Sequence, residues 1–117
     1  MHESVEERQR QMCRTYGADF CPPQPGSKLG VARDVVTDLQ PLNGLRHRPV
    51  GDTCGWYLWR GTDLSQADDY FEPIHVEHVA DECPEVLEFL ALPPGWRFLI
   101  AEGQVDVWYD PSLLTAE

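Results

Sequence analysis

The sequence predicts an α+β domain, with a small antiparallel sheet of about four strands packed against one or two helices. Short segments in which apolar and polar residues alternate recur along the 117-residue chain, and this period is typical of strands. A segment with helical spacing at 83–91 precedes a C-terminal hairpin. Strands, a helix and a hairpin in this order favour an α+β fold with a mostly antiparallel sheet. A chain of this length forms a single compact domain with one core.

The first predicted element is a helix that ends near Tyr16. Ser4 and Glu7 have the spacing of a capping box, in which each side chain binds the other residue's backbone N–H. Gly17 follows at the position where helices commonly end. The apolar stripe of this segment is thin, so we expect the helix to pack at the edge of the domain.

A proline-rich connector separates this helix from the rest of the chain. Three prolines between residues 20 and 26 predict an extended segment. We therefore divide the chain into an N-terminal helix and connector at 1–28 and an α+β domain at 29–117. The segment from about 30 to 36 is predicted to be the first strand.

The segment 37–52 is predicted to be a long loop, because prolines and glycines interrupt it repeatedly. It holds the local basic cluster Arg46, His47 and Arg48. Three such residues are too few for a nucleic-acid site, so we expect a solvated loop tip. The acidic stretch 61–70 is also predicted to be a loop.

The second predicted strand, 54–60, is rich in aromatic residues. Alternation places Trp56 and Leu58 on one face, and Tyr57 and Trp59 on the other. Segment 73–79 carries no decisive signal. A helix is predicted at 83–91, because Pro84 suits a first helical position and an apolar i, i+3, i+4 face follows.

The C-terminal segment predicts a β-hairpin. Residues 96–101 and 105–109 both alternate, and Gly103 lies between them in a short turn. Trp59 and Trp108 each lie on a strand face opposite a more aliphatic set. Tryptophan is enriched at protein interfaces, so these two are the aromatic candidates for a binding surface, with burial in the core as the alternative.

Charge is unevenly distributed along the chain. The net charge is −11, and residues 61–117 hold 13 of the 20 acidic residues against one basic residue, Arg97. Such a chain repels nucleic acid and anionic lipid, and it attracts a basic protein or a cation. Neither a secretion signal nor a membrane-spanning run is evident, so we expect a cytoplasmic protein that binds no membrane. Its four cysteines are then expected to be free thiols.

Enzymatic chemistry has weak support in the sequence. His75 and His78 would share one face of a helix, as a metal pair requires, but their spacing differs from that of zinc proteases. The alternative is one hydrogen-bonded and one exposed histidine. No motif of a nucleophilic enzyme or of a phosphate-binding loop occurs. We expect no cofactor, and a small metal-dependent hydrolase using His75, His78 and nearby carboxylates is the alternative function.

The chain from Gly55 onward contains several specific motifs. These are Gly55-Trp56-Tyr57-Leu58-Trp59, Phe71-x-Pro73-Ile74-His75-Val76-Glu77-His78, Pro93-Pro94-Gly95-Trp96-Arg97-Phe98 and Asp106-Val107-Trp108-Tyr109-Asp110. Together they resemble the bacterial immunity protein 33-like family over roughly residues 29–114. The resemblance implies a cytoplasmic protein that protects a bacterium from a toxin. It supplies no catalytic residues, and we expect that the protein is not an enzyme.

Charge and resemblance together predict a binding protein that neutralises a cognate, basic toxin by occlusion. We expect the toxin to contact an acidic face formed by the 61–72 loop and the hairpin. The predicted contact residues are Asp68, Asp69, Glu72, Asp106 and Trp108. An uncharacterised structural or regulatory domain is the remaining alternative.

Overall fold

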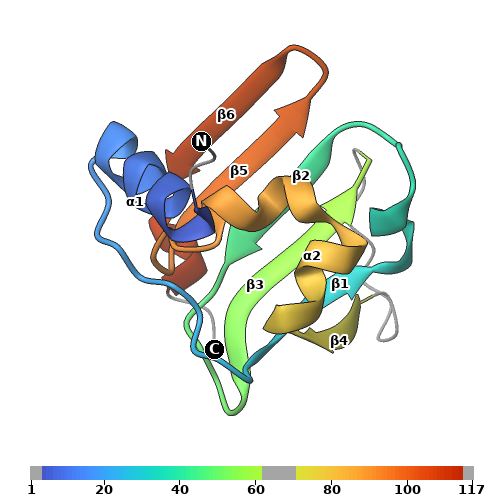
Figure 1. Ribbon diagram of the computed structural model, residues 1–117, viewed down its shortest axis with the longest axis horizontal. Helices are drawn as coiled ribbons and strands as arrows, with labels where there is room; N and C mark the ends of the chain where they lie inside the picture. The colour runs from blue at the N-terminus through green and yellow to red at the C-terminus, as the bar shows by residue number, and fades with distance from the viewer. Residues whose placement is uncertain (1–3, 62–70, 115–117) are drawn as a thin grey trace.

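Six strands form one mixed sheet in the computed structural model, which describes residues 4–61 and 71–114 (Figure 1). The strands are β1 (Lys28–Ala32), β2 (Leu42–Arg46), β3 (Thr53–Arg60), β4 (Phe71–His75), β5 (Trp96–Ala101) and β6 (Gln104–Tyr109). Their order across the sheet is β4-β1-β3-β2-β5-β6. The α+β class is confirmed, whereas the predicted sheet of about four antiparallel strands is wrong.

The sheet is mixed because β1 and β3 run parallel. After β1 the chain passes through the 3₁₀ turn η1 (Arg33–Val36), forms β2, and returns antiparallel as β3. β2 therefore lies between β3 and β5, and β4 pairs antiparallel with β1 at one edge. At the other edge, the predicted hairpin is confirmed as β5 and β6, which pair from Trp96↔Tyr109 to Ala101↔Gln104.

The predicted long loop at 37–52 is wrong, because it contains β2, a central strand. Proline and glycine hide this short strand in the sequence. Gly44 is required there by packing rather than by a turn: a Cβ added at this position would overlap the ring of Phe98 on the neighbouring strand. A strand interior usually disfavours glycine, so its presence here marks a close approach.

The helices lie over one face of the sheet (Figure 1). They are α1 (Val5–Tyr16), η2 (Val76–His78), α2 (Val79–Glu82) and η3 (Pro84–Phe89), and a 3₁₀ turn η4 (Pro111–Leu114) follows β6. α1 is confirmed with its capping box: Glu7 N donates to Ser4 Oγ at 3.1 Å, and Ser4 N donates to Glu7 Oε1 at 2.9 Å. Gly17 ends it in the left-handed region at φ 72°.

The predicted helix at 83–91 is replaced by α2 and the 3₁₀ segment η3. Cys83 separates them with non-helical backbone angles, φ −156° and ψ 71°, because the residue before a proline is disfavoured in the α region. The predicted apolar face survives this change, since Val86, Phe89 and Leu90 are all buried.

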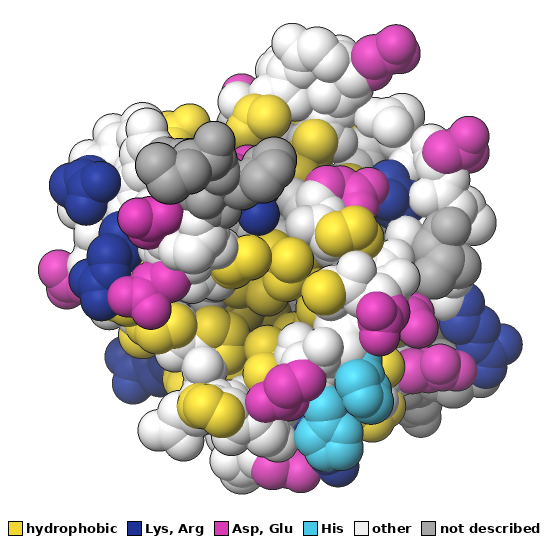
Figure 2. Space-filling view, in the orientation of Figure 1, with side chains coloured by type: hydrophobic (Ala, Val, Ile, Leu, Met, Phe, Trp, Pro, Cys, Tyr) yellow, Lys and Arg dark blue, Asp and Glu magenta, His cyan; other side chains and the backbone are white. Residues whose placement is uncertain are grey.

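The main core lies between the helices and the sheet. Its largest fully buried side chains include Trp56, Leu58, Phe89 and Phe98, and Cys13 joins α1 to it. Figure 2 shows the side of the molecule that bears the helices, with hydrophobic side chains gathered at its middle and acidic side chains around them. Among the described residues, no helix is long and apolar enough to span a membrane.

Candidate functional site

The sheet face opposite the helices carries a row of large side chains. Directly paired residues share a face, and the pairs Trp108↔Arg97, Arg97↔Leu45 and Leu45↔Tyr57 run from β6 to β3. Trp59, two residues beyond Tyr57, lies on this same face. The predicted alternation of the aromatic residues in 54–60 is therefore confirmed.

The rings on this face line a small cavity. Its volume is about 180 Å³, and its lining residues are Leu45, His47, Tyr57, Trp59 and Phe71. The rings of Tyr57 and Phe71 meet edge to face at 5.1 Å, and those of Trp59 and Phe71 at 6.3 Å. Such arrangements stabilise aromatic clusters beyond simple burial. Trp59 itself is only 5% exposed, so it is a buried residue that packs beneath the other rings of this face.

The second feature is the edge of the sheet at β6, which we call the hairpin edge (Gln104–Tyr109). Three large hydrophobic side chains are exposed there: Val105 at 48%, Trp108 at 38% and Tyr109 at 48%. Among the described strands, β6 pairs with β5 alone. A terminal strand of this kind offers backbone N–H and C=O groups to another chain.

Trp108 is held in place by a charged pair at the base of the hairpin. The guanidinium carbon of Arg97 lies 5.4 Å from the centre of the Trp108 ring, within cation–π range. Arg97 Nη1 donates to Asp110 Oδ2 at 3.1 Å. Hydrogen bonds from Ser112 and then from Arg97 lower the pKa of Asp110, so this carboxylate stays ionised.

The structure brings together two of the predicted contact residues. Asp106 and Trp108 lie two positions apart on β6, on the same face, and Gln104 Nε2 donates to Asp106 Oδ2 at 2.8 Å. Glu72 lies on β4 at the opposite edge of the sheet and pairs with Arg33 at 3.3 Å. It also shares a face with its pair Val31, a core residue, and so points to the side of the sheet that bears the helices.

Asp68 and Asp69 lie outside the described residues. Six strands at ordinary spacing place the two sheet edges roughly 24 Å apart. Glu72 and Asp106 therefore belong to separate surfaces of the molecule, not to one continuous patch.

His75 and His78 lie near one another at the end of β4 and in η2. Their ring centres are 6.0 Å apart, and the two ring planes are nearly perpendicular. The intervening Glu77 accepts a hydrogen bond from Gly26 N at 2.8 Å, which lowers the pKa of Glu77. Within residues 4–61 and 71–114, no group of three or more histidine, cysteine, aspartate or glutamate side chains is arranged to hold a metal ion.

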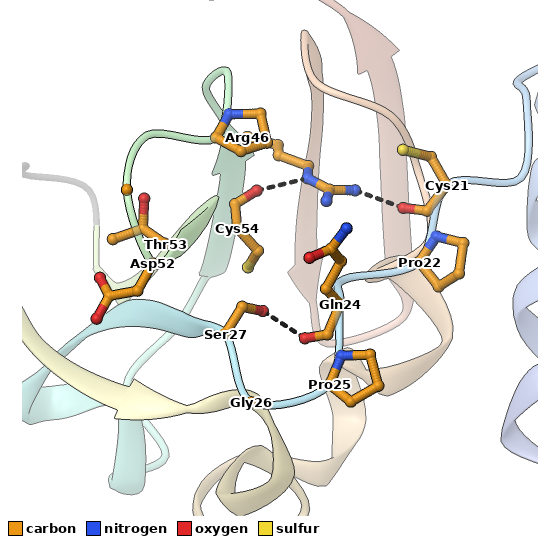
Figure 3. Close-up of a pocket in the computed structure, with 12 residues that line it drawn as sticks. Cys21, Pro22, Gln24, Pro25, Gly26, Ser27, Arg46, Asp52, Thr53 and Cys54 are labelled. Carbon is orange, nitrogen blue, oxygen red and sulfur yellow. Dashed lines mark hydrogen bonds between the residues drawn. The ribbon is translucent and has the colours of Figure 1, made fainter.

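The prediction that Arg46 lies at a solvated loop tip is wrong. Arg46 is the last residue of β2, and its side chain is buried, with 2% exposure. Its Nε donates to Cys54 O at 2.9 Å (Figure 3). Its Nη1 lies 2.6 Å from Cys21 O and 2.8 Å from Leu92 O, and 3.4 Å from Leu90 O. Burial lowers the pKa of Arg46, although a guanidinium in a protein remains charged.

Arg46 lines the larger of the cavities described here, at about 450 Å³. The walls are the proline-rich connector on one side and the turn before β3 on the other (Figure 3). Cys21 and Cys54 belong to the lining, and both cysteines are free. The sequence did not reveal this site, because the site depends on β2, which was predicted to be a loop. The apolar residues Leu42 and Leu45, just before the basic cluster, were the available signal for a strand there.

A family model agrees with the resemblance in the C-terminal motifs. The model of the Imm33-like domain matches residues 8–110. This chain belongs to the Imm33-like family. The match begins within α1, so the Imm33-like region includes most of the helix and the connector as well as the sheet. Searches of curated proteins and of solved structures find no match.

Proposed function

We propose that this Imm33-like protein is an immunity protein, which binds a cognate toxin and neutralises it by occlusion. Family membership supports a toxin partner in general terms. The net charge of −11 favours a basic toxin, because opposite charge accelerates association and disfavours wrong partners. In this proposal the protein acts by binding, in the cytoplasm of the cell that it protects.

We place the toxin contact at the hairpin edge. The observation that carries this choice is the exposure of Val105, Trp108 and Tyr109 on one terminal strand. Exposed tryptophan and tyrosine side chains are typical centres of binding energy in interfaces. The Arg97 guanidinium packs on the Trp108 ring and restricts its motion in the free protein. The ring therefore loses less conformational entropy on binding.

Asp106 and Trp108 have different roles in this proposal. The exposed carboxylate of Asp106 steers a basic partner and acts mainly on the association rate. The Trp108 ring loses its remaining exposed area on binding and acts mainly on the dissociation rate. Glu72 lies at the other edge of the sheet, and we propose it, together with Asp68 and Asp69 of the sequence, as a second, electrostatic contact.

A pair of charge-reversal variants tests the hairpin edge. Asp106→Lys is compared with Asp81→Lys, which makes the same charge change on exposed α2. Both variants alter the net charge equally, so a local contact predicts slower association with the cognate toxin for Asp106→Lys alone. We expect a three- to tenfold difference between the two, measured by surface plasmon resonance at low salt. Equal rates would place the contact elsewhere.

Trp108→Ala tests the aromatic contact. We expect it to lose ~2 kcal/mol of binding free energy and its ability to rescue cells that express the toxin. A thermal melt accompanies the measurement, because Trp108 also packs on Arg97. A melting temperature close to that of the parent assigns the loss to the interface. If the parent protein neither binds nor rescues, the proposed function itself is rejected.

A further inference from the structure

The two buried arginines of this protein differ in how their charge is balanced. Arg60, 7% exposed, donates from Nη2 to Glu85 Oε2 at 2.9 Å. Arg46, 2% exposed, forms no ion pair with any carboxylate of the described residues. Buried charges in proteins are ordinarily paired, so the cation of Arg46 is an unusual feature that calls for a counter-charge.

The guanidinium of Arg46 also has an unused donor group. Nε and Nη1 donate to backbone carbonyls and the Cys21 thiol also interacts with the guanidinium, whereas Nη2 donates to no carbonyl or carboxylate of the described residues. Among the described residues, the side-chain nitrogen that is fully buried and lacks a partner is Nε of Arg97, so Nη2 of Arg46 is not fully buried. Nη2 of Arg46 is therefore accessible, and the space that Arg46 lines is the cavity of about 450 Å³.

The surroundings of Nη2 favour an acceptor with a single negative charge. In Figure 3 the side chain of Gln24 points from the connector toward the guanidinium, which adds an amide to the same end of the cavity. The lysine nearest the rim, Lys28, is already paired with Asp52 at 3.3 Å. Among the residues that line the cavity, Asp52 is thus neutralised and Arg46 is the cation without an acidic partner, and a single cation suits a monoanion better than a phosphate dianion.

We propose that this cavity binds a carboxylate, which accepts a hydrogen bond from Arg46 Nη2 and balances its charge. Proline side chains from both walls, Pro22, Pro25 and Pro49, form an apolar lining for the body of the ligand. The volume suits a small organic acid or the last residues of a peptide, since ligand cavities start at about 300 Å³. This site is independent of toxin binding at the hairpin edge.

Titration with matched probes tests the site. Propionate and N-acetylalanine carry the carboxylate, and propionamide and N-acetylalanine amide are their uncharged controls. Binding is followed by ¹⁵N–¹H spectra of the intact protein, through the Arg46 Nε–H signal and the backbone amides of Gly26 and Ser27. We expect saturable shifts with the acids, in the millimolar range, and at least tenfold weaker ones with the amides. Absence of saturable shifts with both acids would overturn the proposal.

The variant Gln24→Glu provides an internal occupant for the site. It places a carboxylate where the Gln24 amide points at Arg46, so we expect it to weaken propionate binding at least tenfold. Gln11→Glu, on α1 and away from this cavity, makes the same charge change and is expected to bind like the parent. Equal affinities for all three proteins would also overturn the proposal. If Gln24→Glu fails to fold, the comparison of acids with amides on the parent decides.

The two acids separate the sources of the carboxylate. Tighter binding of N-acetylalanine than of propionate assigns the cavity to the carboxyl terminus of a peptide chain. Equal or weaker binding of N-acetylalanine assigns it to a small organic acid.

Discussion

Arg46 joins three parts of the chain that are distant in sequence. Its donors reach the connector at Cys21, the strand β3 at Cys54 and the turn after η3 at Leu92. Each carbonyl is satisfied by a charged donor, which is a stronger interaction than a neutral hydrogen bond. One side chain thereby fixes the connector against the sheet.

Replacing Arg46 by methionine tests this role in stability. Arg46→Met keeps much of the volume but leaves these carbonyls without a donor, so we expect a loss of about 2–4 kcal/mol in the free energy of unfolding by urea. Arg8→Met, on the exposed side of α1, is the control and is expected to change stability by less than ~0.5 kcal/mol. A similar small loss for both variants would contradict the role of Arg46.

Cys83 predicts a decline in stability at alkaline pH. Burial, followed by the nearby Glu85, raises the pKa of its thiol from 9.0 to about 12. Between these values the unfolded chain releases the proton while the folded protein retains it, so stability falls as the pH rises. The contribution of this one group reaches at most ~1.4 kcal/mol per pH unit.

The measurement is urea unfolding at several pH values from 8 upward, on the parent and on Cys83→Ala. Other groups titrate in this range in both proteins, so the difference between them isolates the thiol. We expect the difference in the free energy of unfolding between the parent and Cys83→Ala to shrink as the pH rises. A constant difference would show that the thiol does not titrate with a raised pKa.

At the scale of single elements, β2 depends on Gly44. Because the Phe98 ring occupies the space where a Cβ would lie, we expect Gly44→Ala to destabilise the protein by about 1–3 kcal/mol. Phe98→Leu makes room, so the double variant should lose less than the sum of the single losses in denaturant unfolding. Additive losses would show that the Phe98 contact does not determine the residue at position 44.

The elements that the sequence predicted correctly have local signals. α1 has its capping box and terminal Gly17, and the hairpin of β5 and β6 has two alternating segments around Gly103. β2 and β4 were missed because each is short and contains a glycine or proline that weakens the local pattern. β4 also pairs with β1, which lies about forty residues earlier in the chain. The 3₁₀ geometry of η3 was missed because its apolar spacing fits either helix type.

The candidate site was predictable only where it depended on alternation. The pattern in 54–60 and 105–109 placed Trp59 and Trp108 on the face away from the main core, as observed. The acidic residues gave no such guidance, because a loop can bring them to either edge. The Arg46 cavity depends on β2 and also on the parallel pairing of β1 and β3, and no local pattern in the chain indicates that pairing.

At the scale of the whole molecule, the fold separates three features. The core lies between the helices and one face of the sheet, the aromatic cavity lies on the other face, and the hairpin edge lies at one end of the strand order. The described residues that line the Arg46 cavity include none from β6, so we expect a partner at the hairpin edge to leave this cavity accessible. Binding at the two sites is expected to be independent.

The hairpin edge also has a consequence for colloidal behaviour. A terminal strand with exposed Val105, Trp108 and Tyr109 would readily add a second copy of itself. At neutral pH every copy carries the same strong negative charge, and mutual repulsion keeps the adhesive edges of two copies apart while a basic chain can approach. That protection weakens near the isoelectric pH of about 4.6, where the copies no longer repel. We therefore expect the negative charge to keep copies of this protein apart at neutral pH, and acidification to make them associate.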